Sequence, residues 1–310
     1  MRVLIAEADH DRYRELLQRA APQLQLVAGS EPAELAGQAA DCPVWLGEPD
    51  RFAELLRGGL RPQWLQSTWA GITPLLADDL PRDYLLSRAV GVFGQVMAEY
   101  VLGHMLAHER QLLSRLQAQR EQRWDNRQPR SLAGRRVVIV GAGEIGVAVA
   151  GFLQPFGVEL RGIASSARTL APFAEVAGLQ ELPRLAAEAD YLVNLLPNTP
   201  ATCDVYDAAL FARLKPSAVF INAGRGTAVV DEDLVAALAQ RRLAAAVIDV
   251  CREEPLPAGH PFWTADNLLL TGHSAAPTPP ARLIELFLGN LQRYRDGTAL
   301  QGQVDFTRGY

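Results

Sequence analysis

The stretch Val137-Val-Ile-Val-Gly-Ala-Gly-Glu-Ile-Gly146 decides how this chain folds. Its four β-branched residues predict a buried strand, and the three glycines that follow predict a tight turn and the first turn of a helix. Gly141 suits the turn, Gly143 leaves room for a phosphate beside the backbone, and Gly146 lets the helix pack closely on the strand. A helix N-terminus offers unpaired N–H groups and a partial positive charge, so this segment, with Glu144 and Ile145, is predicted to bind a dinucleotide. The alternative is a purely structural turn.

Length and composition limit the class of protein. A chain of 310 residues is longer than one compact core usually supports, so we expect two domains. A net charge of −5 without a basic run argues against nucleic-acid binding. No apolar stretch is long enough to span a bilayer, and Val3–Ala6 is too short for the core of a signal peptide. Three widely separated cysteines suggest neither disulfides nor a metal cluster, and a reducing cytoplasm is the expected location.

The first hundred residues alternate short apolar runs with helical patterns. This alternation predicts an α/β domain with a parallel sheet covered on both faces. The expected strands are 3–6, 24–27, 44–46, 64–66 and 84–86, and the expected helices lie at 13–17, 32–38 and 51–56.

Residues 95–117 contain no proline and predict one long helix of roughly 30 Å or more at 1.5 Å per residue. Such a helix could bridge the two domains or pair with a second copy of the chain. His104 and His108 lie four residues apart on it, as metal ligands sometimes do. Because no glutamate follows His104 and no third ligand is evident, histidines at a helix surface or interface are the preferred interpretation.

The strand predicted at 159–163 bears on the choice of nucleotide. In NAD-binding sites an acidic residue about 20 positions beyond the glycines holds the ribose hydroxyls. The sequence here reads Ala164-Ser-Ser-Ala-Arg168, which offers Ser165, Ser166 and Arg168 to a 2′-phosphate. We therefore expect NADP(H) to be preferred over NAD(H). The alternative is that Arg168 begins the next helix.

Three later strands, expected at 219–221, 244–248 and 268–270, each precede a polar residue. Arg225 follows the first, Asp249 and Glu254 the second, and His273 the third. In open α/β sheets ligands bind beyond the carboxyl ends of the strands, so these side chains are expected to meet near the glycine turn. Taken singly, each could be an ordinary loop or structural residue.

The three residue types suit the reduction of a 2-keto acid. Histidine can supply a proton as hydride reaches the carbonyl carbon, and a carboxylate can fix its tautomer. Arginine can grip a carboxylate with two hydrogen bonds. We assign His273 as acid/base, Glu254 as its orienting partner, Arg225 as substrate anchor and Asp249 as a contact of the nicotinamide.

Four segments resemble the D-isomer-specific 2-hydroxyacid dehydrogenase family, over most of the chain: 132–146, 222–226, 249–255 and 271–275. The resemblance implies that Arg225, Glu254 and His273 are the catalytic residues. It also implies two doubly wound α/β domains, a Rossmann-type cofactor domain at 99–274 inserted in a flavodoxin-like substrate domain formed by 1–98 and 275–310. A homodimer is implied, formed mainly through the cofactor domain. Further cofactor contacts are expected at Pro197 and Ala223.

Two other stretches extend the resemblance. Ser67-Thr-Trp-Ala-Gly-Ile72 resembles the family loop whose backbone N–H groups receive the substrate carboxylate, with Trp69, Ala70 and Gly71 as expected contacts. Segments 92–100 and 304–310 resemble the glyoxylate/hydroxypyruvate reductase branch. Trp45 is assigned to the same pocket, with a core position as the alternative. Ala164 departs from the acidic residue of NAD-using relatives.

The leading hypothesis is an NADPH-dependent reductase of a small 2-keto acid such as glyoxylate or hydroxypyruvate, giving the D-2-hydroxy acid. One alternative keeps this chemistry and changes the substrate to a bulkier keto acid. Another is a dinucleotide-sensing regulatory protein, since the family resembled includes transcriptional corepressors. A metalloenzyme has only the pair His104 and His108 in its favour.

Overall fold

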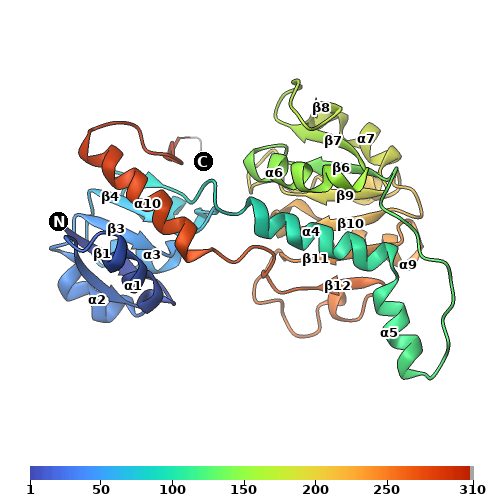
Figure 1. The fold of residues 1–310 in the computed structure, drawn as a ribbon, viewed down its shortest axis with the longest axis horizontal. Helices are drawn as coiled ribbons and strands as arrows, with labels where there is room; N and C mark the ends of the chain where they lie inside the picture. The colour runs from blue at the N-terminus through green and yellow to red at the C-terminus, as the bar shows by residue number, and fades with distance from the viewer. Residues whose placement is uncertain (308–310) are drawn as a thin grey trace. The chain divides into compact units, whose positions relative to one another are not determined.

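The structure, a computed structural model, describes residues 1–307, so the last three positions of the terminal segment 304–310 lie outside it. The chain divides into two compact α/β units (Figure 1). Unit 1 comprises Met1–Phe93 and the chain from Thr278 onward, and unit 2 comprises Gly94–Pro277. From the sequence we expected the first domain to comprise residues 1–98 and 275–310, and the second to comprise residues 99–274. Among the described residues no helix is long and apolar enough to cross a membrane.

Unit 1 is built on a parallel sheet that, within residues 1–307, has five strands in the order β2-β1-β3-β4-β5. This is the flavodoxin-like order, and it confirms the predicted α/β class. The strands are β1 (Arg2–Ala6), β2 (Gln25–Gly29), β3 (Val44–Gly47), β4 (Trp64–Ser67) and β5 (Leu85–Ser87). The helices are α1 (His10–Ala20), α2 (Pro32–Ala39), α3 (Pro49–Arg57), the short η1 (Thr73–Leu76) and α10 (Pro280–Arg295).

Helices cover both faces of this sheet. Trp45 and Leu65 point to the face covered by α2 and α3, whereas Trp64, on the other face, stacks on Phe287 of α10. Since successive strand residues point to opposite faces, strands this apolar must be covered on both sides.

Unit 2 carries a parallel sheet of seven strands in the described chain, in the order β12-β11-β10-β9-β6-β7-β8. Glycine-turn strand β6 lies near its middle, and every neighbouring pair is parallel, as predicted. The strands are β6 (Arg136–Val140), β7 (Glu159–Ala164), β8 (Glu175–Gly178), β9 (Tyr191–Asn194), β10 (Val219–Asn222), β11 (Ala245–Ile248) and β12 (Leu268–Leu270). The helices are α4 (Gly94–Glu109), α5 (Leu112–Arg120), α6 (Glu144–Leu153), α7 (Leu182–Glu188), α8 (Ala208–Phe211) and α9 (Asp231–Ala239), with short turns η2 (Gln154–Phe156), η3 (Leu179–Glu181), η4 (Gly226–Ala228) and η5 (Pro261–Trp263).

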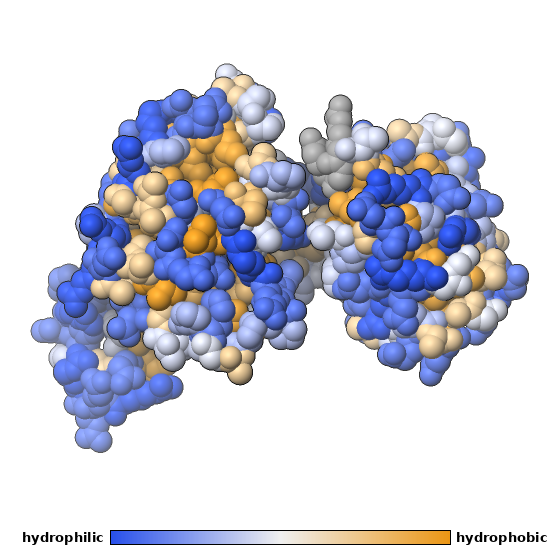
Figure 2. Space-filling view, turned by 180° about the vertical axis from the view of Figure 1, so that it is seen from behind, coloured by the Kyte–Doolittle hydropathy of each residue, from blue (hydrophilic) through white to orange (hydrophobic). Residues whose placement is uncertain are grey.

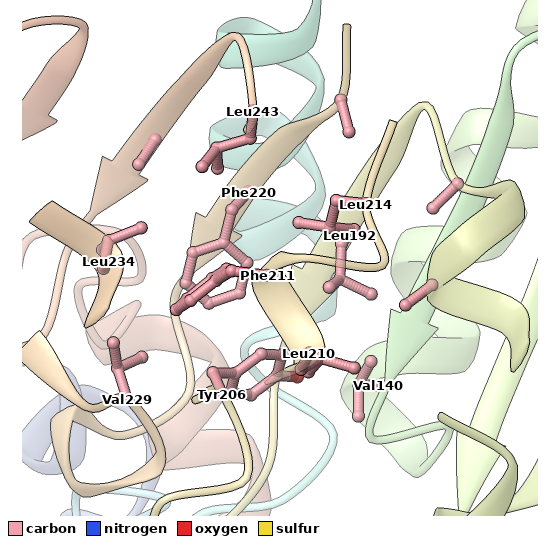
Figure 3. Close-up of a cluster of buried hydrophobic side chains, with 14 of the residues drawn as sticks. Val140, Leu192, Tyr206, Leu210, Phe211, Leu214, Phe220, Val229, Leu234 and Leu243 are labelled. Carbon is pink, nitrogen blue, oxygen red and sulfur yellow. The ribbon is translucent and has the colours of Figure 1, made fainter. Parts of the chain in front are cut away.

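Alternate residues of these strands fill two separate cores. Val138, Leu192 and Phe220 pack with α7, α8 and α9, and Figure 3 shows part of this cluster around Tyr206 and Phe211. Val137 and Ile139 point the other way and pack with α4 and α6. Because both faces of the sheet are buried, the register of each strand is fixed. The position of each strand's carboxyl end is fixed with it.

The single helix predicted over 95–117 is wrong, because the chain breaks between α4 and α5. Gln111 adopts the left-handed conformation at φ 57°. The last residue of α4, Glu109, is buried and accepts a hydrogen bond from Tyr191 of β9, so the end of α4 is tied to the sheet. α5 leaves the line of α4 and projects from unit 2 (Figure 1). The break follows from this tertiary contact and has no local proline or glycine signal.

Candidate active site

The glycine turn after β6 is held tightly against its neighbours. The N–H groups of Gly141 and Ala142 both donate to the carbonyl of Ile163 on β7, at 2.9 and 2.8 Å. Gly141 has φ 111°, and a Cβ there would lie 2.8 Å from the carbonyl carbon of Leu195. Only glycine combines this backbone conformation with so close an approach.

The other two glycines differ in what surrounds them. A Cβ at Gly146 would lie 2.3 Å from the carbonyl oxygen of Gly141, so the helix packs directly on the turn. A Cβ at Gly143 would meet no protein atom within 4 Å, although Gly143 immediately precedes α6. Space therefore remains beside the first turn of α6, where Glu144 is exposed and Ile145 half-buried. This space fits a phosphate group at a helix N-terminus.

Arg168 returns from the end of β7 to the glycine turn. Its Nη2 donates to the carbonyl of Ala142 at 2.8 Å, and its backbone pairs with Val176 of β8. Ser165 and Ser166 are exposed beside it. The alternative that Arg168 begins a helix is wrong, because the chain continues into the strand β8, which sequence reasoning missed.

Glu254 and His273 are brought into direct contact. Oε2 of Glu254 lies 2.6 Å from Nδ1 of His273, and Oε1 accepts the N–H of Cys251 at 2.8 Å. The imidazole is 56% exposed and its Nε2 has no part in this contact. A carboxylate on Nδ1 favours the tautomer in which Nδ1 carries hydrogen, so Nε2 is the atom left to exchange a proton with a ligand.

The backbone of His273 is held in a left-handed conformation at φ 56°. Its N–H donates to the carbonyl of Asp249 at 2.6 Å, which ties the turn after β12 to the end of β11. A non-glycine residue adopts this conformation only where its surroundings enforce it.

The buried Asp249 carboxylate supplies most of that enforcement. Its Oδ1 accepts from the hydroxyl of Thr271 at 2.6 Å and from the N–H of Ser274 at 2.8 Å. Thr271 in turn lies 2.9 Å from the hydroxyl of Tyr100 on α4. Since the Thr271 hydrogen is directed to Asp249, Tyr100 is the donor in this second bond. Asp249 thus positions the turn of His273, and its contact with the nicotinamide stays a prediction.

Arg225 leaves β10 three residues after the strand ends and is half-buried. Nη1 donates to the carbonyl of Gly224 at 2.6 Å. Burial lowers the pKa of the guanidinium, and the carboxylate of Glu254 acts in the opposite direction. Arginine remains charged under both influences, so a partly desolvated cation faces the Glu254 carboxylate and can bind an anion strongly.

Two asparagines that sequence reasoning did not single out hold the Arg225 loop. Asn194 and Asn222 are buried at the last positions of β9 and β10, and Asn194 donates to Asn222 at 2.8 Å. Asn222 also accepts the N–H of Gly224 and donates to the carbonyl of Arg225. The sequence feature that could have indicated this role is an asparagine at the last position of each of two neighbouring apolar strands.

The remaining cofactor candidates lie at the same carboxyl edge. Pro197 is exposed after β9, and its carbonyl accepts from Thr202 at 2.6 Å. Ala223 is buried after β10, with its N–H bonded to the carbonyl of Asn194. Their contacts with a nucleotide stay predictions.

The substrate-loop candidates belong to unit 1, at the carboxyl end of β4. Trp69 is 37% exposed, and its N–H is bound by the hydroxyl of Ser67. Ala70 and Gly71 are half-buried, and within residues 1–307 their N–H groups have no protein acceptor. Such N–H groups can bind a carboxylate.

The assignment of Trp45 to the substrate pocket is not supported. Its side chain is 0% exposed and packs against Phe52, and its indole N–H donates to the carbonyl of Cys42 at 2.9 Å. A tryptophan satisfied in this way belongs to the core, which was the alternative interpretation.

His104 and His108 of α4 have other side chains beside them. The described residues contain no group of three or more histidine, cysteine, aspartate or glutamate side chains arranged to hold a metal ion. His104 packs edge-on against Tyr100, and His108 lies 2.8 Å from Nη2 of Arg130. Burial lowers the pKa of both imidazoles, which favours their neutral forms.

A glycine turn beside the carboxyl end of β6, and an arginine, a glutamate and a histidine beyond β10, β11 and β12, define a nucleotide-dependent dehydrogenase of the doubly wound class. Residues 102–275 match the model of the D-isomer specific 2-hydroxyacid dehydrogenase NAD-binding domain. The chain belongs to this family and is an NAD(P)-dependent 2-keto acid reductase of the branch that includes glyoxylate/hydroxypyruvate reductase A.

Relatives in sequence and in structure agree with this placement. The chain is 34% identical to glyoxylate/hydroxypyruvate reductase A of Yersinia enterocolitica over 69% of this chain and 68% of that protein. The corresponding protein of Serratia proteamaculans is 36% identical over 70% and 69%. A family member from Aeromonas salmonicida superposes with a TM-score of 0.94 at 35% identity, over 98% of this chain and 99% of that one. An NADPH-dependent glyoxylate/hydroxypyruvate reductase from Sinorhizobium meliloti, solved with NADP and sulfate, gives 0.87 at 28% identity over 100% and 99%.

Proposed function

We propose that this protein reduces a small 2-keto acid of the glyoxylate or hydroxypyruvate type with NADPH, giving the D-2-hydroxy acid where the product is chiral. The observation that carries the proposal is the Glu254–His273 contact at the edge of the sheet that also holds Arg225 and the glycine turn. Relatives named as glyoxylate/hydroxypyruvate reductases support the substrate class.

Each of the three proposed catalytic side chains has a defined role. The nicotinamide supplies hydride when bound, and negative charge then develops on the substrate carbonyl oxygen. Nε2 of His273 delivers the proton to that oxygen, while Glu254 keeps Nδ1 protonated and the ring oriented. Arg225 stabilises the developing charge and binds the substrate carboxylate with its planar fork.

The preference for NADP(H) over NAD(H) is argued from the end of β7. Ser165, Ser166 and Arg168 follow the end of β7, where they offer two exposed hydroxyls and a guanidinium to a 2′-phosphate, and Ala164 contributes no carboxylate to repel it. Similar proteins from Sinorhizobium meliloti, Rhizobium etli and Xanthobacter autotrophicus have been solved with NADP or NADPH, which supports this preference.

The N–H groups of Ala70 and Gly71 are proposed to receive the substrate carboxylate, with Trp69 as an apolar wall. Their lack of acceptors within the described chain supports this role.

The deciding experiment is a panel of 2-keto acids of increasing size assayed with NADPH and with NADH. We expect kcat/KM to be greatest for glyoxylate or hydroxypyruvate with NADPH. A maximum at a branched or aromatic keto acid would replace the substrate assignment. Tight NADPH binding without turnover of any keto acid would favour the dinucleotide-sensing regulatory protein.

We also propose a homodimer, in the cytoplasm, with α5 in the interface. Leu112, Leu113 and Leu116 of α5 and Trp124 just beyond it are 53%, 61%, 45% and 91% exposed. So much exposed apolar surface on one projecting segment is typical of a protein contact. From the side drawn in Figure 2 the projecting segment is largely hydrophilic, so the surface is amphipathic and not uniformly apolar.

A further inference from the structure

Three polar residues of unit 1 lie side by side at the carboxyl edge of its sheet. Ala6, Gly47 and Ser67 are partners in the register of β1, β3 and β4. The ladder of backbone hydrogen bonds continues one residue further. The N–H of Glu48 donates to the carbonyl of Ala6, and the N–H of Thr68 donates to the carbonyl of Gly47. Glu7, Glu48 and Thr68 therefore stand at one level and project to the same face, on strands about 4.8 Å apart.

The approach of β1 to β3 is unusually close at this level. A Cβ at Gly47 would lie 2.0 Å from the carbonyl oxygen of Ala6. The two glutamates that follow, Glu7 and Glu48, interact through their side chains at the point where the strand order reverses. In open α/β sheets this is the position at which functional groups gather.

Among residues 1–307, Arg51 forms an ion pair with Glu48, whereas Glu7 has no ion pair. Nε of Arg51 is hydrogen-bonded to Glu48, and Arg51 also binds the carbonyl of Ser30. Glu7 is 8% exposed, and its Oε2 is buried without a hydrogen-bond partner in the described part of the chain, as is Oγ1 of Thr68. Burial without such a partner disfavours the ionised form of Glu7.

The other groups around Glu7 do not offset its charge. Tyr13 of α1 is buried, and burial raises its pKa above the ordinary value, so it stays neutral; Asp9 adds a further negative charge near Tyr13. Burial is the largest influence on Glu7, and together with the neighbouring Glu48 it raises the pKa of Glu7 to about 8. Thr68 and Arg51 act in the opposite direction. At neutral pH the cluster therefore contains a carboxylic acid that can donate a hydrogen bond.

We propose that Glu7 is a positioning residue: as a neutral acid it links Glu48 to Thr68 and thereby holds the loop Thr68–Gly71 in the shape that receives a substrate carboxylate. The proposal rests on the function proposed for that loop. Thr68 is the direct connection, since its N–H donates to the carbonyl of Gly47, its carbonyl accepts from Thr278 at 2.9 Å, and its side chain interacts with Glu7. Ionisation of Glu7 places two negative charges beside this loop, which loosens Thr68 and repels an anionic substrate.

The first test follows the loop without any substrate. Hydrogen exchange of the peptide 66–74 is compared at pH 6.5 and pH 9, after correction for the intrinsic rate, in the wild type, Glu7→Gln and the exposed control Glu34→Gln. Because an amide donates at both pH values, we expect protection to fall about tenfold in the wild type and the control and to stay constant in Glu7→Gln. Equal behaviour of Glu7→Gln and the wild type would overturn the proposal.

The second test connects the loop to binding. The KM for the best keto acid is expected to rise about tenfold above pH 8 in the wild type relative to Glu7→Gln, while kcat changes in parallel in both. A loop response without this KM difference would overturn the link to substrate binding. If no keto acid is turned over, the proposed function fails, and the exchange experiment still decides whether Glu7 holds the loop.

A second variant covers the case in which Glu7→Gln does not fold. Glu48→Gln removes the neighbouring negative charge, so Glu7 ionises more easily. The pH at which the loop loosens is then expected to fall by at least one unit. An unchanged midpoint would contradict the coupling between the two carboxyl groups.

Discussion

Oε2 of Glu254 lies 2.6 Å from Nδ1 of His273, although nineteen residues separate the two along the chain. The contact closes only because β11 and β12 are neighbours that end at one level, with Ile248 paired to Leu270. The same carboxylate also binds the N–H of Cys251, so it cannot turn away from the histidine without losing a second bond.

Replacing His273 by asparagine is expected to lower kcat by about 10²–10⁴-fold, the usual contribution of a general acid. The dissociation constant for NADPH should change little, because the phosphate-binding turn is untouched. Single-turnover kinetics and fluorescence titration measure the two quantities, and near-normal turnover would remove His273 from the mechanism.

Glu254→Gln should lower kcat about tenfold or more, since an amide fixes neither the tautomer nor the charge of the imidazole. The adjacent and exposed Glu253→Gln makes the same change of charge one residue away and should behave like the wild type. Equal activities of the two variants would show that the contact is only structural.

Arg225→Lys should reduce kcat/KM by about 10²-fold, mainly through KM, because a point charge cannot reproduce two parallel hydrogen bonds. The exposed Arg213→Lys is the matched control. Steady-state kinetics with the best keto acid provide the measurement. A loss confined to kcat would assign Arg225 to the transition state alone.

The nucleotide preference should depend on the end of β7. Arg168→Ala is expected to lower kcat/KM for NADPH about tenfold and leave the value for NADH nearly constant, whereas the exposed Arg242→Ala changes neither. Ala164→Asp should add repulsion of the 2′-phosphate and move the preference toward NADH. A parallel loss with both nucleotides in Arg168→Ala would assign Arg168 to the turn itself, through its bond to Ala142.

Two glycines of the turn should respond in opposite ways to the same substitution. Gly146→Ala places a Cβ 2.3 Å from a carbonyl oxygen and should destabilise the fold by about 1–3 kcal/mol. Gly143→Ala meets no protein atom, so the melting temperature should hold while NADPH affinity falls. Calorimetry and nucleotide titration of both variants separate these effects. Unchanged affinity in Gly143→Ala would place the phosphates elsewhere.

The proposed homodimer is expected to depend on the exposed leucines of α5. Leu113→Glu combined with Leu116→Glu should convert the protein to a monomer, because charge is poorly tolerated in a buried apolar contact. Gln119→Glu on the same helix adds charge without removing apolar surface and should leave the assembly unchanged. Light scattering after size exclusion gives the mass. A wild-type monomer would end this proposal.

The order of elements was predictable wherever an apolar run is fully buried. The strands at Val3, Val44 and Val137 are of this kind, since covered parallel strands carry continuous apolar sequence. The placement of Glu254 and His273 followed from the rule that parallel strands end at one edge. The strand β8 was missed because Glu175-Val-Ala-Gly178 is a short strand at the edge of the sheet, with a weak pattern.

Other features depend on contacts that no local pattern encodes. The turn at Gln111 depends on Glu109 finding Tyr191 eighty-two residues away. From the sequence, Trp45 was assigned to the substrate pocket. Its packing against Phe52, which the sequence does not encode locally, places it in the core. The buried state of Glu7 likewise depends on how closely β1 approaches β3.

The chain of hydrogen bonds from Tyr100 through Thr271 to Asp249 lies within unit 2, and the N–H of His273, in its left-handed turn, is bonded to the carbonyl of the same Asp249. The imidazole that we propose as proton donor is therefore oriented by residues of unit 2. We therefore expect that substitutions in the loops of unit 1 can change which keto acid is preferred, while the residues that orient His273 stay the same.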